Sequence, residues 1–288
     1  MKNKISLGTA NFNSNYGINR NNLNLKNKDI KKILIFAEKN QIRSIDTATN
    51  YAGVEKKLGQ FKLKKFKISS KLKAISKSVN NIENKILSEI QASLKRLKIK
   101  KLEILYLHNS KDLIDKKKKF KVYEALKKAK KLNLIKKIGI SVYSKNDLIK
   151  IINQFKIEAV QLPYSLIDRR FEKIFLLLKK KNISIQVRSI FLQGLLLQNF
   201  NEMPKYFLKF KEIKQFEEWT KKNKISKLEA SINFVKNSKY INSIVIGFNN
   251  IFQLKQITQC FNKKKFFYPK KIHSKDINLI DPRKWRVN

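Results

Sequence analysis

Four ionisable side chains of different types lie at or just after the ends of apolar runs in the first 108 residues: Asp46, Tyr51, Lys71 and His108. Each run has the length and apolar content of a buried strand. A carboxylate at the end of a buried strand is costly unless a cation lies beside it, so we expect Lys71 next to Asp46. The sequence therefore predicts that these side chains share one site.

This set of groups favours proton transfer to a carbonyl oxygen. Lys71 beside Asp46 would stay protonated, and a cation near a phenol favours the phenolate, so Tyr51 is a candidate general acid. His108 can donate a hydrogen bond to the developing oxyanion. None of the four is a good nucleophile, and a metal would lack enough ligands. Carbonyl reduction fits if a nicotinamide cofactor supplies the hydride, because no side chain can do so.

Each residue also has a purely structural interpretation. Asp46 and Lys71 would form a structural ion pair, Tyr51 an aromatic residue at a helix start, and His108 a histidine satisfied in the core. The functional interpretation rests on the four occurring together at successive strand ends.

The elements that position these residues alternate regularly along the chain. Strands are predicted at 4–9, 42–45, 66–71, 102–107, 135–141, 159–162, 183–187 and 243–247. Helices are predicted from Asp29 as N-cap, and at 53–60, 79–98, 118–132, 145–155, 166–180, 206–223, 226–237 and 251–261. This alternation predicts an α/β fold with a parallel sheet. A doubly wound open sheet also alternates in this way. Eight strands, without a Gly-x-Gly-x-x-Gly after any of them, favour a (β/α)8 TIM barrel, in which chemistry lies at the carboxyl ends of the strands.

Composition and length predict one domain over residues 1–288, with a barrel core at about 4–262 and a C-terminal tail, 263–288, over one barrel face. No apolar run is long enough to span a membrane, and the first residues do not form a signal peptide. The lone Cys260 is expected to be a core thiol, and His273 a surface residue. We expect a cytoplasmic protein of unknown oligomeric state.

The formal net charge of +45 comes from 66 Lys and Arg against 21 Asp and Glu residues. One interpretation is a nucleic-acid or anionic membrane partner. The excess is almost all lysine, however, and is spread along the chain rather than gathered in one segment. Abundant Lys, Asn and Ile with little Ala, Gly and Pro is typical of a compositionally biased genome, and we expect no specific nucleic-acid partner. Attraction of an anionic substrate or cofactor is the remaining functional explanation.

At the four candidate residues the chain resembles the aldo-keto reductase family. Asp46-Thr-Ala-x-x-Tyr51, followed by Glu55 and by Gly59, is similar to the first signature of that family, and Lys71 and His108 match its other catalytic positions. The resemblance covers almost the whole chain. It implies that Tyr51 is the acid, that Lys71 and Asp46 tune it, and that His108 orients the carbonyl group of a small-molecule substrate.

The same resemblance implies a nicotinamide cofactor, with NADP(H) favoured and NAD(H) as the alternative. Residues 139–142 resemble a motif that holds the carboxamide, residues 188–194 a segment that stacks on nicotinamide and holds pyrophosphate, and residues 245–250 lead into a helix whose free amides would face phosphate. The implied cofactor-binding residues are Gly8, Thr9, Ser141, Gln161, Arg188, Ser189, Leu192, Gly194, Gly247, Asn249 and Gln253. No metal is implied.

Several positions depart from the family pattern. Val142 replaces an Asn of the carboxamide motif, and Ala52 replaces a Gly after the acid. Asn249 stands where many NADP-dependent members have Arg, and Ile257 replaces a common Asn. Arg188 replaces the usual aromatic residue; its planar guanidinium can also stack on a ring, or else meet a phosphate or an acidic substrate group.

The residues near the start and those around 188–196 look most like a bacterial subgroup that is often associated with sugar or surface-polysaccharide metabolism. The substrate pocket is expected to be lined by Phe12, Tyr16, Asn109 and Trp285. The leading hypothesis is therefore an NAD(P)H-dependent aldo-keto reductase of an aldehyde or ketone, with a sugar derivative as one substrate class. The alternatives are a regulatory barrel that binds the cofactor with little turnover, and a charge-driven nucleic-acid binder.

Overall fold

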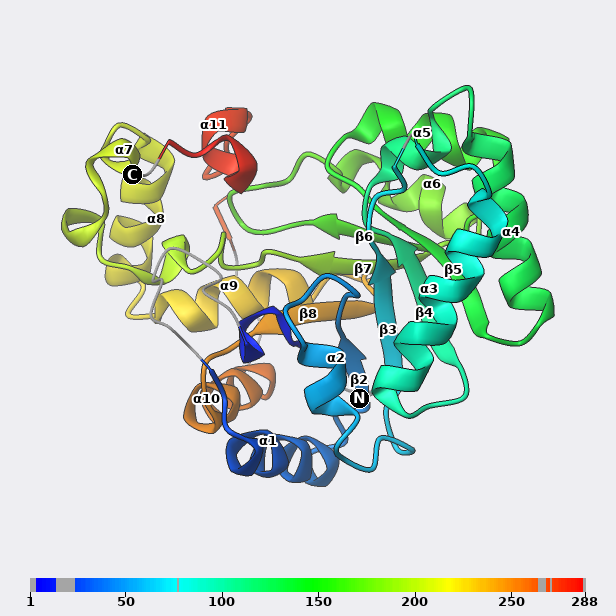
Figure 1. Ribbon diagram of the computed structural model, residues 1–288. Coiled ribbons are helices and arrows are strands. Elements are labelled where there is room, and N and C mark those ends of the chain that lie inside the picture. The colour runs from blue at the N-terminus through cyan, green and yellow to red at the C-terminus, as the bar shows by residue number, and fades with distance from the viewer. Residues whose placement is uncertain (1–3, 14–23, 77, 264–267, 270, 287–288) are drawn as a thin grey trace.

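Eight parallel strands close into a barrel in the order β1 to β8, with helices around it (Figure 1). The computed structural model describes residues 4–13, 24–76, 78–263, 268–269 and 271–286. The strands are β1 (Ile5–Gly8), β2 (Ser44–Asp46), β3 (Lys67–Leu72), β4 (Leu102–Leu107), β5 (Ile135–Ser141), β6 (Ala159–Pro163), β7 (Ser184–Arg188) and β8 (Ser243–Gly247). The predicted (β/α)8 barrel is confirmed, and the open sheet is excluded because β1 pairs with β8.

The helices follow the strands as the alternation predicts. They are α1 (Asn27–Lys39), α2 (Val54–Leu58), α3 (Ile82–Leu97), α4 (Lys119–Lys131), α5 (Lys145–Gln154), α6 (Phe175–Lys180), α7 (Lys205–Leu208), α8 (Lys211–Lys222), α9 (Lys227–Lys236), α10 (Ile251–Phe261) and α11 (Ile277–Ile280). Short 3-10 turns are η1 (Ala10–Phe12), η2 (Ser110–Leu113), η3 (Glu172–Ile174), η4 (Leu195–Leu197), η5 (Phe200–Glu202) and η6 (Pro282–Lys284). No helix in the described ranges is long and apolar enough to cross a membrane.

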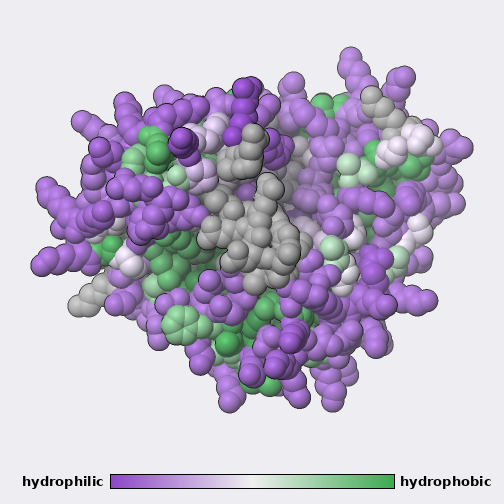
Figure 2. All heavy atoms as spheres, turned by 60° about the vertical axis from the view of Figure 1, so that its left-hand side comes forward, coloured by the Kyte–Doolittle hydropathy of each residue, from purple (hydrophilic) through white to green (hydrophobic). Residues whose placement is uncertain are grey.

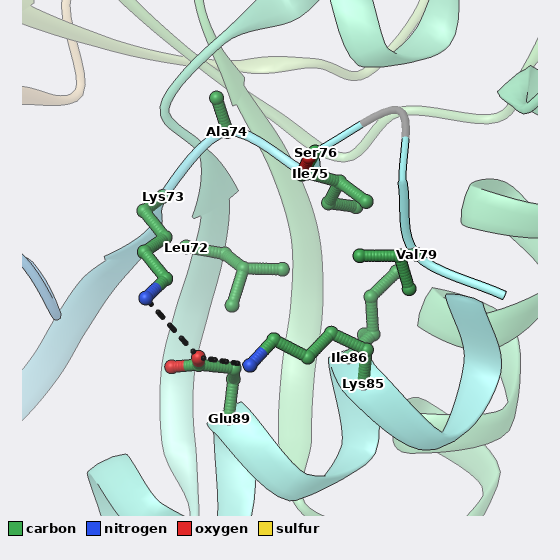
Figure 3. A pocket seen from close by; sticks show the side chains of 9 residues that line it. All are labelled: Leu72, Lys73, Ala74, Ile75, Ser76, Val79, Lys85, Ile86 and Glu89. Atoms are coloured by element: carbon green, nitrogen blue, oxygen red, sulfur yellow. Dashed lines mark ion pairs between the residues drawn. The ribbon is translucent and has the colours of Figure 1, made fainter. Parts of the chain in front are cut away.

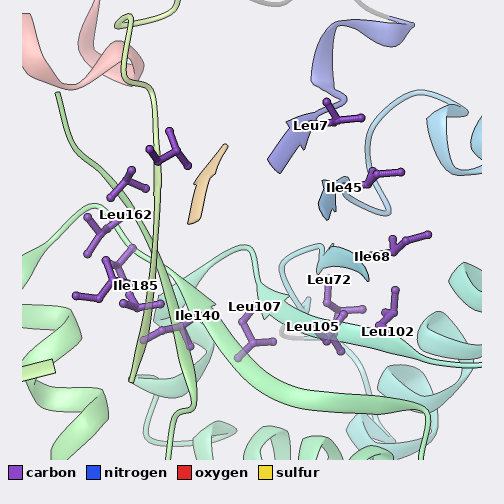
Figure 4. Packing of buried hydrophobic residues seen from close by; sticks show 14 of the residues in the cluster. Leu7, Ile45, Ile68, Leu72, Leu102, Leu105, Leu107, Ile140, Leu162 and Ile185 are labelled. Atoms are coloured by element: carbon purple, nitrogen blue, oxygen red, sulfur yellow. The ribbon is translucent and has the colours of Figure 1, made fainter. Parts of the chain in front are cut away.

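Strand alternation divides the core into two parts. Side chains such as Leu7, Ile45 and Ile68 are buried in one large apolar cluster together with apolar residues of the surrounding helices (Figure 4). Their neighbours along the strands point to the other face, inside the barrel, where the Oγ atoms of Ser6 and Ser44 lie 3.0 Å apart. Since the strands are parallel, their carboxyl ends meet at one mouth, where the polar side chains of the barrel interior gather.

Three helical boundaries differ from the predictions. Asp29 lies in the first turn of α1 instead of capping it, because the helix begins two residues earlier. The helix predicted at 166–180 forms only from Phe175, after the 3-10 turn η3, because the backbone N–H of Asp168 donates to Ser165 Oγ at 2.9 Å and this local turn competes with helix. The helix predicted at 206–223 is split at Phe210, which has an extended backbone and a buried ring.

The C-terminal segment packs beside α7 and α8 (Figure 1). Ser274 N–H donates to Ile167 O at 2.9 Å, and Arg170 donates to the carbonyl of Ile280. The segment is therefore bonded to the loop after β6, and it contains α11 and η6 in addition to the extended stretches that the sequence predicted. Cys260 is a buried free thiol, as predicted, and His273 is half-buried.

Most charged side chains lie on the surface of the molecule. Figure 2 shows one face of the molecule covered largely by hydrophilic side chains, with smaller hydrophobic areas between them. Many lysines pair with the few acids, as Lys128 does with Glu83 and Lys130 with Glu158. Exposed pairs of this kind contribute little to stability.

Candidate active site

Asp46 and Lys71 form a buried ion pair at the barrel mouth. Asp46 is the last residue of β2, and Lys71 is the penultimate residue of β3; each is 2% exposed. Lys71 Nζ donates to Asp46 Oδ2 at 2.5 Å and to Thr47 O at 3.0 Å. Burial acts to lower the pKa of Lys71, but the charge of Asp46, and then that of Tyr51, outweigh it, so the pKa is raised. The ammonium is therefore kept charged inside the barrel.

Tyr51 is held in the loop between β2 and α2, as the sequence predicts. Its N–H donates to Ala48 O at 3.1 Å, and its carbonyl accepts from Val54 N–H at 2.9 Å. Lys71 Nζ lies 5.2 Å from the centroid of the Tyr51 ring, and hydrogen bonding with Tyr51 is one of the influences that raise the pKa of Lys71. The phenol is half-buried. The predicted acid and the predicted cation therefore lie together.

His108 follows β4 directly, and its backbone N–H donates to Leu72 O at 2.9 Å. Its side chain is half-buried. Burial, followed by the positive charges of Lys71 and Arg188, lowers the pKa of His108 to about 4. At neutral pH the imidazole is therefore uncharged, with one N–H to donate and one nitrogen to accept.

Gln161 extends the polar network across the barrel. Its Nε2 donates to Asp46 Oδ1 at 2.7 Å and to Gln186 Oε1 at 2.5 Å. Gln161 is fully buried, and its Oε1 has no hydrogen-bond partner among the described residues. A buried acceptor without a partner costs free energy, and the amide N–H groups of a nicotinamide carboxamide would satisfy it. The interior of the barrel therefore fits the cofactor that the sequence predicts.

Tyr106 lies beside this network and was not predicted. It is fully buried on β4, its hydroxyl has no partner among the described residues, and its ring leaves no room for a side chain at Gly139, where a Cβ would lie 2.5 Å from Tyr106 Cδ1. Burial, and then the charge of Asp46, raise the pKa of Tyr106 well above its ordinary value. Tyr106 pairs in register with Lys71, and this register is known only from the structure.

The remaining carboxamide and β1 candidates lie on the strands beside this network. Ser141 ends β5 and pairs in register with Gln161. Thr9 is fully buried, and its Oγ1 donates to Asp46 O at 3.0 Å. Gly8 pairs in register with Gly247. Thr9 therefore positions the strand end that carries Asp46.

The predicted pyrophosphate segment is a series of tight turns after β7. Ser189, Leu192 and Gly194 all have positive φ, and only Gly194, at 96°, is a glycine. Leu192 is fully buried, so only its backbone is available to a ligand. This strained conformation in a loop at the barrel mouth is typical of a functional segment.

The predicted adenosine end is formed by the loop between β8 and α10. Gln253 Oε1 accepts from Asn249 N–H at 2.7 Å, and Asn249 Oδ1 accepts from Asn11 Nδ2 at 2.8 Å. Gly247 is exposed beside them. These side chains therefore offer amide groups and no positive charge at this end.

The four substrate-pocket candidates have different positions. Phe12 is fully buried and packs edge-to-face on Phe248 with centroids 5.9 Å apart, and its place in the substrate pocket stays a prediction. Trp285 is half-buried against Phe207 and donates to Leu279 O at 2.8 Å. Asn109 is exposed. Tyr16 lies outside the described residues.

Two cavities lie beside the mouth. The first, of about 170 Å³, lies between the loop after β3 and α3, where Lys73 and Lys85 both pair with Glu89 (Figure 3). The second, of about 490 Å³, is lined by Asn109 and by the Asp112–Lys118 pair. Neither contains a residue of the Asp46 network. Their charges are paired within the protein, so we do not place the chemistry in either.

Arg188, at the end of β7, stacks on Tyr143 with its guanidinium carbon 4.1 Å from the ring centroid. Its Nη1 donates to Ser189 Oγ at 3.4 Å and its Nη2 to Val142 O at 3.5 Å. Val142 itself is fully buried. The side chain that replaces the expected aromatic therefore has an aromatic partner of its own.

The sequence profile described as "Aldo/keto reductase family" matches residues 4–270. A curated relative, "Uncharacterized oxidoreductase YqkF" of Bacillus subtilis (strain 168), is 27% identical over 192 residues, which is 61% of this chain and 60% of that protein. The chain therefore matches about 60% of the length of this relative.

Solved structures match over most of the barrel. The aldo-keto reductase AKR11C1 from Bacillus halodurans superposes in its holo form with a TM-score of 0.74 at 20% identity, covering 92% of this chain and 88% of that one. Its apo form gives a TM-score of 0.70 at 20% identity, with 84% of each chain covered. At this identity the likeness is one of fold.

Proposed function

Because the chain belongs to the aldo/keto reductase family, we propose that it reduces the aldehyde or ketone group of a small molecule, with hydride from a nicotinamide cofactor and a proton from Tyr51. Hydride would add to the carbonyl carbon, and the proton to the carbonyl oxygen, giving an alcohol and the oxidised cofactor. The observation that carries the proposal is the buried Lys71, bonded to Asp46 at 2.5 Å with its ammonium 5.2 Å from the Tyr51 ring centroid.

The protonation states support Tyr51 as the acid. A histidine with a pKa of about 4 has lost its imidazolium proton at neutral pH, so His108 is a poor proton source. As a neutral imidazole it can still donate a hydrogen bond to the carbonyl oxygen and orient it. Lys71 remains charged and stabilises the phenolate that forms when Tyr51 gives up its proton. Asp46 keeps that charge in place.

The cofactor, when bound, supplies the hydride. Gln161 would hold its carboxamide through the free Oε1, with Ser141 beside it in register. The loops at residues 189–194 and 247–253 would hold the rest, with Gly8 and Thr9 supporting the mouth. We favour NADP(H), because the family usually uses it. NAD(H) is the alternative, because Asn249 and Gln253 carry no positive charge that would bind a 2′-phosphate.

The test follows oxidation of NADPH and NADH against a panel of aldehydes, ketones and sugar derivatives. Tyr51→Phe should lose about 10²–10⁴-fold in kcat while retaining cofactor affinity measured by fluorescence quenching. Tyr240→Phe, at the opposite end of the barrel before β8, is the matched control and should be unchanged. Wild-type-like turnover by Tyr51→Phe would reject the acid, and cofactor binding without turnover of any substrate would reject the reductase.

A further inference from the structure

Arg188 is one of three arginines grouped around Tyr143 at the barrel mouth. Arg283, from the C-terminal segment, places its guanidinium carbon 3.5 Å from the Tyr143 centroid, and Arg188 places its own at 4.1 Å. Both guanidiniums therefore pack against the same aromatic ring. Arg170 Nη1 donates to Tyr143 O at 3.3 Å. Tyr143 therefore fixes the orientation of both stacked guanidiniums.

The two acids of this group form ion pairs with Arg283 and Arg170. Arg283 makes two hydrogen bonds to Asp281, at 2.9 and 2.6 Å, and Arg170 pairs with Asp168 at 2.9 Å. Within the part of the chain that the structure describes, no carboxylate lies within ion-pair distance of Arg188. The three arginines and two aspartates of this group therefore have a formal net charge of +1. The two hydrogen bonds of Arg188, at 3.4 and 3.5 Å, are long.

This unpaired cation lies near the reacting groups. Arg188 is half-buried, and its charge is one of the influences on the imidazole of His108. One face of the guanidinium packs on Tyr143, whereas the N–H groups along its edge make two long hydrogen bonds to the described residues. A guanidinium edge of this kind binds carboxylate with two parallel hydrogen bonds.

We propose that Arg188 binds an anionic group of the substrate, so that the enzyme prefers carbonyl compounds carrying a carboxylate a few bonds from the aldehyde or ketone. Tyr143 and Arg283 are positioning residues that hold the guanidinium edge toward the mouth. The inference rests on the proposed reductase function and adds the substrate class. The same edge also suits phosphate, so the test includes both anions.

The experiment compares kcat/KM for matched pairs of aldehydes: 4-oxobutanoate with butanal, 4-carboxybenzaldehyde with methyl 4-formylbenzoate, and glyceraldehyde 3-phosphate with glyceraldehyde. We expect the wild type to favour one anionic member at least tenfold. In Arg188→Gln the ratio of anionic to neutral kcat/KM should fall about 10–100-fold, the size expected for a charged hydrogen bond, whereas Arg188→Lys should recover part of it. The ratio of anionic to neutral kcat/KM reports on binding of the anion, because a change in cofactor affinity affects both members of a pair equally.

Because the whole chain is basic, a matched loss of charge is needed as a control. Lys239→Gln, in the loop before β8 at the other end of the barrel, should leave the ratio unchanged. An equal fall in both variants would assign the preference to overall charge and overturn the proposal. A fall in kcat/KM for both members together with weaker NADPH binding would assign Arg188 to the cofactor, and would also overturn it.

A second measurement needs no variant. Inhibition of butanal reduction by 4-hydroxybutanoate should be at least tenfold stronger than inhibition by 1-butanol. Equal inhibition would overturn the anion site even if Arg188→Gln does not fold. Turnover of neutral aldehydes with no preference for anions would reject this inference and leave the proposed function standing, whereas no turnover of any aldehyde would reject the proposed function itself.

Discussion

Gln161 Nε2 donates to Asp46 Oδ1 at 2.7 Å, while Lys71 Nζ donates to the other oxygen of the same carboxylate at 2.5 Å. One buried acid therefore holds both the proposed proton machinery and the side chain whose free Oε1 fits a carboxamide. The proposed proton transfer and the proposed orientation of the cofactor therefore both depend on Asp46.

Removing the charge of Asp46 tests its ion pair with Lys71 directly. Asp46→Asn should cost about 3–5 kcal/mol of unfolding free energy at pH 7, because it leaves the Lys71 ammonium buried without a counter-ion. The folded-state pKa of Lys71 would then fall below its unfolded value, so protonation favours the unfolded chain, and the deficit should shrink as pH rises toward 10. Urea unfolding at both pH values measures this. The double variant Asp46→Asn/Lys71→Met should recover much of the loss; no recovery would contradict the pairing.

The low pKa of His108 predicts a pH dependence of stability. The folded-state pKa is about 4 against an ordinary 6.5, so the unfolded chain binds the proton first as pH falls. The stabilisation of the folded state by the neutral His108 is therefore fully present above about pH 6.5. As the pH falls from there to about pH 4, the free energy of unfolding should decrease by up to about 3 kcal/mol. In His108→Gln this decrease of the unfolding free energy between about pH 6.5 and pH 4 should disappear.

NMR can follow the same group, since the chain has only 2 His residues and a His273→Gln variant assigns the signals. Arg188→Gln should raise the pKa of His108, because it removes one of the positive charges that lower it. A His108 signal that titrates near 6.5 in the wild type would contradict the site geometry.

Gln161→Leu should weaken NADPH binding about tenfold, because a buried acceptor for the carboxamide is lost. Fluorescence titration measures the affinity, and thermal unfolding shows how far the fold is affected. Gln154→Leu on the exposed end of α5 is the matched control. Unchanged affinity in Gln161→Leu would place the carboxamide elsewhere.

Gly139→Ala should destabilise the barrel by about 1–3 kcal/mol, because the new Cβ would lie 2.5 Å from the Tyr106 ring. Gly247→Ala is the control, as the nearest atom to its Cβ would be 4.0 Å away. Adding Tyr106→Ala to Gly139→Ala should reduce the cost of the glycine substitution in a double-mutant cycle, with Ile104 Cγ2, at 2.9 Å, left as the remaining close contact. Additive effects would mean that the ring does not limit position 139.

The sequence predicted the barrel and the meeting of Asp46, Tyr51, Lys71 and His108, because parallel strands bring their carboxyl ends together whatever the details of packing. It did not predict Tyr106, since an aromatic residue within a strand looks like ordinary core until the register is known.

The Arg188–Tyr143–Arg283 stack was also out of reach of sequence analysis. It joins β7, the loop after β5 and the C-terminal segment, and no local pattern links residues so far apart. The helix predicted at 166–180 failed at a local turn, where Ser165 bonds Asp168 in place of helical hydrogen bonds.

The enclosure of Lys71 has a chemical consequence for a protein crowded with lysine. Reagents that acylate amines would modify the surface ammoniums and strip away most of the positive charge, while the ammonium bonded to Asp46 stays out of their reach. Peptide mapping after exhaustive acetylation of the folded protein should therefore find this position unmodified. The lysine on which the proposed turnover depends is therefore protected from reagents that modify the exposed lysines.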